Sequence, residues 1–175
     1  EVIRLRGRLD VAALTRSLQA IVDRHAVLRT AFVEVDGMPR QRIEAKITLT
    51  LPVVPVAESD MGAAIAAEVA RPMDLARAPL LRPVLFRLAE DDHVLLLAMH
   101  HIVSDGWSMG IIDRELGALY RAALADPVRA LDDVLPPLPL QFADYARWLG
   151  EPGHAAERAA QLDWWRSRLR GLRAT

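Results

Sequence analysis

The fold of this chain is decided by the stretch Met99-His100-His101-Ile102-Val103-Ser104-Asp105-Gly106-Trp107-Ser108. It follows a run of apolar residues, 93–99, that is rich in the types favoured in buried strands. Ser104, Asp105 and Gly106 mark a turn and a helix start, and apolar residues then recur at three- and four-residue spacing. The pattern predicts a strand over 93–103, a tight turn, and a helix over about 107–124.

The adjacent histidines allow several interpretations. Side chains alternate along a strand, so His100 and His101 are expected to face opposite sides of it. A histidine beside an apolar strand is most often a hydrogen-bonded core or edge residue, and Asp105 can be a simple helix cap. A metal site is disfavoured, because diverging histidines and one aspartate make a poor ligand set in a chain without cysteine.

The whole pattern His-His-x-x-x-Asp-Gly, formed here by His100, His101, Asp105 and Gly106, resembles the signature of condensation domains. These domains belong to nonribosomal peptide synthetases and have the chloramphenicol-acetyltransferase-like fold. The resemblance implies that His101 and Gly106 are catalytic, while His100 and Asp105 support the site. It also makes Trp107 and Ser108 candidates for lining the substrate tunnel.

A second motif lies near the N-terminus. Residues 24–32 read Arg-His-x-x-Leu-Arg-Thr-x-Phe, which resembles the second core motif of the family. In the family the arginine after the leucine pairs with the aspartate of the His-His motif. The resemblance therefore implies an ion pair between Arg29 and Asp105, which would hold the turn that carries His101.

Further motifs follow in the family's order. Residues 73–82 resemble the loop Phe-Asp-Leu-x-x-x-Pro-Leu-x-Arg, with Met73 in place of the phenylalanine. Residues 142–148 resemble the fourth motif, Tyr-x-Asp-Phe/Tyr-Ala-x-Trp, with Phe142 in place of the tyrosine. Their aromatic residues also fit a simple amphipathic helix, which is the interpretation favoured for those side chains.

Local patterns predict the remaining elements. They are a strand over 2–9, a helix capped by Asp10, a hairpin over 32–43 turning at Asp36-Gly37, strands over 47–56 and 81–88, a helix over 59–70, a proline-rich loop over 127–139 and a last helix over 154–172. The strand over 81–88 and the histidine strand are expected to pair. Together the elements predict an α/β fold, a two-layer sandwich whose mostly antiparallel or mixed sheet is covered by helices.

Composition narrows the class of protein. Of the 175 residues 52% are hydrophobic and 26% charged, which is typical of a soluble globular chain rather than a disordered one. The net charge of −1 favours neither nucleic acid nor membrane as a partner, and no apolar run reaches the length of a membrane span. The absence of cysteine fits a cytoplasmic location. Lys46 is the only lysine among 22 basic residues, which suggests a GC-rich bacterial source.

The resemblance implies a function and partners. Condensation domains join the amine of an acceptor aminoacyl thioester to a donor thioester, with both substrates held on phosphopantetheine arms of carrier domains. No cofactor is expected in the domain itself. The implied partners are donor and acceptor carrier domains, and an adjacent adenylation domain or second lobe of the same synthase.

The extent of the match predicts an incomplete domain. Condensation domains have two lobes, and residues 1–175 match the N-terminal lobe without the first motif, Ser-x-Ala-Gln-x-Arg, or the C-terminal lobe. The chain alone is therefore expected to be inactive. Two alternatives stay open. They are an acyl-CoA-dependent acyltransferase of the same fold and a non-catalytic lobe that docks carrier proteins.

Overall fold

A computed structural model describes residues 1–172 of the chain. The chain divides into two compact units, with the division in the sequence between Leu138 and Pro139. Within the described residues, no helix has both the length and the apolar character needed to cross a membrane.

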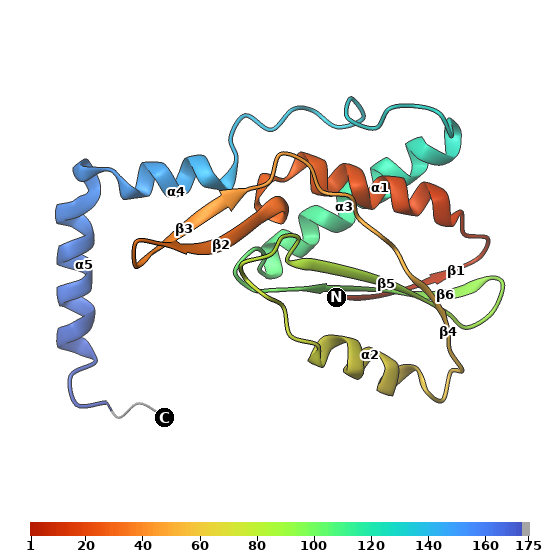
Figure 1. Cartoon of the computed structure of the whole chain (residues 1–175), viewed down its shortest axis with the longest axis horizontal. Helices are drawn as coiled ribbons and strands as arrows, with labels where there is room; N and C mark the ends of the chain where they lie inside the picture. Colours follow the sequence, from red (N-terminus) through yellow and green to blue (C-terminus); the bar gives the residue numbers. More distant parts are fainter. Residues whose placement is uncertain (173–175) are drawn as a thin grey trace. The chain divides into compact units, whose positions relative to one another are not determined.

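A four-stranded sheet lies at the centre of the first unit (Figure 1). Its strand order is β1 (Val2–Arg6), β6 (Asp92–Met99), β5 (Leu81–Arg87) and β4 (Val53–Pro55). Strand β6 pairs antiparallel with both β1 and β5, whereas β4 runs parallel to β5. The predicted mixed, mostly antiparallel sheet is therefore confirmed, as is the predicted pairing of β5 with the histidine strand.

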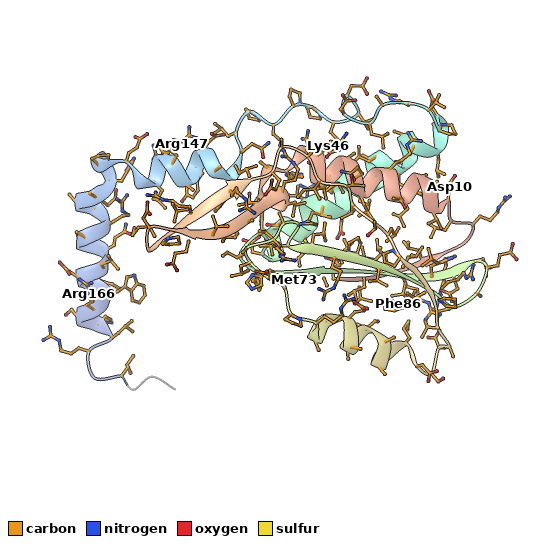
Figure 2. The ribbon with its side chains drawn as sticks, in the orientation of Figure 1. Asp10, Lys46, Met73, Phe86, Arg147 and Arg166 are labelled. Atoms are coloured by element: carbon orange, nitrogen blue, oxygen red, sulfur yellow. The ribbon has the colours of Figure 1, made fainter. Side chains whose placement is uncertain are left out.

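Helices cover both faces of this sheet. Helices α1 (Val11–Arg24) and α3 (Gly106–Ala125) lie on one face, and α2 (Met61–Ala70) lies on the other (Figure 1). Figure 2 shows Phe86 of β5 directed toward α2. Because β5 and β6 are buried on both faces, they read as continuous apolar runs rather than as alternating strands.

Two polar contacts attach the start of α1. The Asp10 carboxylate accepts a hydrogen bond from the Ala13 N–H at 2.9 Å, which confirms the predicted cap. The Asp10 N–H in turn donates to the hydroxyl of Tyr120 on α3 at 3.0 Å. Between α1 and the sheet, the fully buried side chains of Leu18 and Ile21 face the core.

The predicted hairpin over 32–43 is confirmed, one turn of 3-10 helix (Ala26–Arg29) after α1. It consists of β2 (Thr30–Val35) and β3 (Met38–Ile43), which pair antiparallel. Asp36 and Gly37 at its tip have φ angles of 53° and 72°. Both values lie in the left-handed region that a two-residue type I′ turn requires, and Asp-Gly is a favoured sequence there.

The predicted strand over 47–56 is wrong for most of its length, because only β4 at its end pairs with the sheet. The side chains of Ile47 and Leu49 are buried, which explains the strand-like pattern. Their backbone, however, is bound by a side chain. The Gln19 amide donates to the Ile47 carbonyl and accepts from the Leu49 N–H, both at 2.8 Å. One glutamine thus replaces a strand partner.

The second unit consists of short helices. They are α4 (Phe142–Gly150), a 3-10 turn (Pro152–His154) and α5 (Ala155–Arg168). The rings of Phe142, Tyr145 and Trp148 follow one another along α4, with centroids about 6 Å apart (6.0 and 5.8 Å), and Trp148 contacts His154. This agrees with the amphipathic helix favoured for the fourth motif. The last helix is shorter than the predicted 154–172.

Leu95 at the centre of β6 provides a test of this core. Its side chain has no exposed surface, so Leu95→Ala should lower the free energy of unfolding by about 2–5 kcal/mol through lost burial and a cavity. The measurement is chemical denaturation. The control is Leu124→Ala, the same change at a side chain that is 47% exposed on α3. Similar losses in both variants would contradict the assigned core.

Candidate active site

The histidines lie in a turn and not on a strand. Strand β6 ends at Met99, before the predicted end at 103. The Val103 N–H donates to the His100 carbonyl at 3.1 Å, which closes a turn with His101 inside it. The apolar pair Ile102-Val103 has the pattern of a continuing strand, but both residues belong to the turn. Val103 is buried there, whereas Ile102 is 40% exposed. The alternation argument for the two histidines is therefore wrong.

The backbone fixes the tautomer of His101. Its Nδ1 lies 2.8 Å from the carbonyl oxygen of Ser104. A carbonyl can only accept, so Nδ1 carries the proton and donates it. In the neutral ring Nε2 then has a free lone pair. The side chain is exposed, so this lone pair is open to a ligand.

His100 has the opposite arrangement. Its Nδ1 accepts a hydrogen bond from the Ile102 N–H at 3.1 Å, so the neutral ring carries its proton on Nε2. The residue is half-buried, and its own N–H donates to the Leu80 carbonyl at 3.1 Å. It also borders a cavity of about 440 Å³ between the end of α2 and the end of β6. The two histidines thus differ in burial and in the ring nitrogen that carries the proton of the neutral ring, and it is His100 that borders the cavity.

Asp105 caps helix α3. Its carboxylate accepts from the Ser108 N–H at 2.8 Å and from the Ser108 hydroxyl at 2.6 Å. The Asp105 N–H lies 3.3 Å from the same hydroxyl, which completes a reciprocal capping box. The Ser108 hydroxyl, and then the Ser108 N–H, hold the pKa of Asp105 below its usual value. The side chain of Ser108, predicted to line a tunnel, is therefore engaged in the cap.

The first residues of α3 are open. A methyl group added at Gly106 would meet no atom within 4 Å, so packing in this chain does not demand glycine there. N–H groups in the first turn of a helix have no partner within the helix. Trp107 follows with 83% of its side chain exposed. The helix start beside the histidine turn is thus accessible and carries one large aromatic side chain.

The predicted ion pair between Arg29 and Asp105 is not formed. Arg29 donates to backbone carbonyls at the end of α1, those of Val22 (3.1 Å) and Asp23 (3.3 Å). It also donates to the carbonyls of Glu44 and Ala45 after β3. Carbonyls at a helix C-terminus lack partners and attract cations. Arg29 therefore fastens α1 to the end of the hairpin, while Asp105 is satisfied locally by Ser108.

The sequence did not reveal the contacts of three groups in or near the candidate site. The Ser104 carbonyl that orients His101 is a backbone group, which no residue pattern reveals. The spacing Asp-x-x-Ser is typical of a capping box and indicated the role of Ser108. Ser108 was instead predicted to line the substrate tunnel. The third is Glu115 on α3, which contacts both Arg24 and His25 at the end of α1.

Comparison with known protein families gives one match over the whole chain. A family model described as "Condensation domain" matches residues 1–175. A linear gramicidin synthase protein from Brevibacillus parabrevis is 41% identical over 176 residues, covering 97% of this chain and 2% of that protein. The beauvericin nonribosomal cyclodepsipeptide synthetase of Gibberella fujikuroi is 40% identical, covering 95% of this chain and 5% of that protein. These relatives are bacterial and fungal, so they do not support an assignment to bacteria in particular.

Solved structures agree with the fold. The X-domain from teicoplanin biosynthesis is 38% identical with a TM-score of 0.84, covering 98% of this chain and 38% of that one. A condensation domain for chain release from the enacyloxin polyketide synthase is 30% identical with a TM-score of 0.66. It covers 99% of this chain and 34% of that one. The chain thus spans well under half of these solved relatives and a small part of the curated ones.

The cap of α3 can be tested by pH. Asp105→Ala should lower Tm by about 2–4 °C at pH 7 because the helix loses its cap. The pKa of Asp105 is lowered in the folded state. The stability that the Asp105 carboxylate contributes is therefore complete above its ordinary pKa of about 3.9. This stability is lost as the pH falls through the lower pKa that Asp105 has in the folded state. We expect the Tm difference to narrow below about pH 3.9.

The control for this prediction is Asp105→Asn, which keeps a capping side chain without the charge. The Tm of Asp105→Asn at pH 7 should be closer to that of the wild-type protein than to that of Asp105→Ala. A double-mutant cycle with Arg29→Ala tests the missing ion pair, and the two losses should add because the side chains do not meet. Strong coupling between Arg29 and Asp105 would contradict the separate roles described above.

Proposed function

Because the chain belongs to the condensation-domain family, we propose that residues 1–175 are the N-terminal, histidine-bearing lobe of a nonribosomal peptide synthetase condensation domain. In the complete domain this lobe contributes the groups that act on the reacting amine. The observation that carries the proposal is the hydrogen bond from His101 Nδ1 to the Ser104 carbonyl, 2.8 Å long, which leaves Nε2 as an exposed acceptor.

The proposed reaction forms an amide from a thioester. The nitrogen of the acceptor amine attacks the thioester carbonyl of the donor, the C–S bond breaks, and the donor carrier's thiol is released. In this proposal His101 Nε2 either accepts the proton that the nitrogen loses and passes it to the departing sulfur, or orients the amine while that proton reaches the sulfur through solvent. A free α-amine has a pKa of about 7.7–8.0, so an appreciable minority of it, about a tenth or more, is neutral near pH 7. Tethering both substrates supplies further acceleration through positioning.

The neighbouring residues take supporting roles in this proposal. Gly106 leaves the helix start open, so that a backbone N–H there can approach the oxyanion that develops on the carbonyl. Trp107 offers an exposed aromatic surface to the substrate arm or to the second lobe. His100 and Asp105 hold the turn through the Ile102 N–H and the α3 cap. Arg29 supports the site from a distance by fixing the end of α1.

The proposed partners follow from the same reaction. They are donor and acceptor carrier domains, whose phosphopantetheine arms bring the substrates, and an adjacent adenylation domain or second lobe of the same synthase. We propose no cofactor bound by this lobe, and we place the reaction in the cytoplasm.

A second candidate is a lobe that recruits another protein without condensing. It is favoured by the similarity to the X-domain of teicoplanin biosynthesis, which has been solved in complex with OxyB. That chain is 37% identical with a TM-score of 0.83. In the neutral ring of His101, Nε2 is left as an acceptor, which favours the condensing function because a recruiting surface has no need for a proton acceptor.

Substitution of each histidine in the complete domain tests the assignment. His101→Ala should reduce dipeptide formation by about 10²–10⁴-fold if His101 accepts the proton. His100→Ala should act mainly on stability. The measurement is single-turnover dipeptide formation from preloaded carriers between pH 6 and 9. Partial recovery of His101→Ala at high pH identifies a base, because the amine is then already neutral, whereas an unchanged loss identifies an orienting role.

A His101→Ala domain with normal activity, beside a folded but inactive His100→Ala domain, would overturn the assignment. Soluble acyl-CoA donors, supplied in place of the loaded donor carrier, distinguish the acyl-CoA-dependent alternative. A wild-type complete domain that binds another protein but forms no amide would support the recruiting function instead.

The chain by itself provides a separate test. If its partner lobe supplies the other wall of the site, residues 1–175 should form no dipeptide above background from the same carriers. The complete domain, measured in parallel at equal concentration, is the positive control. Turnover by the chain alone at a rate comparable to the complete domain would refute the single-lobe assignment.

A further inference from the structure

One cluster of polar side chains joins the second motif to the helix that follows the histidine turn. The carboxylate of Glu115 on α3 lies 3.1 Å from Arg24 Nε and 2.6 Å from His25 Nε2. The side chains of Glu115, Arg24 and His25 are only 12%, 16% and 18% exposed. Neither motif of the sequence analysis explains this cluster, and the proposed reaction does not use it.

The degree of burial separates this cluster from ordinary surface pairs. Arg166 and Asp163, for example, form an ion pair in which both side chains are 75% exposed. Such pairs contribute little, because water and salt screen them. A carboxylate shielded from water interacts more strongly with its partners and holds them in a defined geometry. Glu115 therefore restrains α3 against the end of α1.

The place of Glu115 on α3 gives this restraint its significance. The buried residues of α3 begin at Ile112, so the part of the helix before it has no buried side chain. The direction of that part is set by the partly buried Met109, which packs against the core, and by the contacts that follow it, Ile112, Glu115 and Leu116. Among the buried contacts that follow Met109, only Glu115 binds through directional hydrogen bonds.

The start of α3 is in turn continuous with the histidine turn. Asp105 joins the turn to the first helical turn through Ser108, and the Ser104 carbonyl beside it holds His101 Nδ1. A shift of the helix start therefore moves the Ser104 carbonyl and the imidazole that it orients.

We propose that Glu115 is a positioning residue, which binds Arg24 and His25 and thereby holds the start of α3 and the His101 turn in place. Its effect on catalysis rests on the proposed condensation reaction, whereas its effect on the turn does not. The proposal also gives the Arg-His pair of the second motif a role. The pair anchors α3 from the end of α1.

Tyr120 offers a matched control on the same helix. Its hydroxyl accepts from the Asp10 N–H at 3.0 Å, at the opposite end of the contact between α1 and α3. Tyr120→Phe removes one polar contact between the same two helices, at the start of α1 instead of at its end. Any general loosening of the helix pair should affect both variants.

The test compares Glu115→Gln with Tyr120→Phe in the complete domain. Hydrogen exchange by mass spectrometry follows the peptide 100–108, which contains the turn and the cap. We expect Glu115→Gln to raise exchange there several-fold, while the β6 peptide 92–99 stays protected. Tyr120→Phe should leave 100–108 unchanged. Glu115→Asp, which keeps the charge with a shorter reach, is measured alongside in case the glutamine variant unfolds.

The second readout is the kinetics of dipeptide formation. A small displacement of a reacting group costs up to about 100-fold in rate, so we expect Glu115→Gln to lower kcat by about 10-fold or more while KM changes little. Tyr120→Phe should leave both constants nearly unchanged. Equal exchange at 100–108 in the two variants, or increased exchange throughout β6 in both Glu115 variants, would overturn the proposal. A wild-type domain without condensing activity would refute the proposed function, and the exchange result alone would then decide the role of Glu115.

Discussion

The burial of β6 on both faces is the constraint on which the rest of the structure depends. The strand lies between β1 and β5, and its side chains enter a core shared with α1 and α3 on one face and a core shared with α2 on the other. A segment buried in this way has little room for polar side chains. His93 is a buried polar residue within the strand, and the polar residues of the candidate site come after the strand ends at Met99.

The turn after β6 reconciles this apolar strand with a polar site. Three of its polar side chains are bound locally, with His101 on the Ser104 carbonyl, His100 on the Ile102 N–H and Asp105 on Ser108. Local bonds of this kind give the two imidazoles defined and opposite tautomers without help from another element. The apolar anchor that seats the turn on the core is Val103, which is 6% exposed.

Polar side chains in the rest of the unit act as connectors between elements. Gln19 replaces a strand partner for the segment 47–49, Arg29 binds carbonyls of α1 and of the segment after β3, and Glu115 binds the end of α1. Gln19 and Glu115 make these bonds in part-buried surroundings, where a polar group needs a hydrogen-bond partner. The apolar core sets which elements pack together, and these connectors determine their exact placement.

The sequence by itself determined the elements whose signals are local. The cap at Asp10, the Asp-Gly hairpin, the apolar runs of β5 and β6, and the start of α3 all follow from residues within a few positions of one another. The motif spacing also identified the histidine turn as the candidate site. Each of these depends on backbone propensity or on a short-range hydrogen bond, which a pattern can show.

Only the tertiary structure decided the contacts between distant residues. Ile47 and Leu49 have the pattern of a strand, yet the partner of their backbone is the side chain of Gln19, which lies 28 and 30 residues before them in the sequence. Arg29 was expected to bind Asp105, but the carbonyls at the end of α1 lie closer to it and need a donor, while Asp105 finds one in Ser108. Glu115 belongs to no motif, and its partners Arg24 and His25 lie 91 and 90 residues away in the sequence. A long-range partner is chosen by the packing of whole elements, and no local pattern encodes that choice.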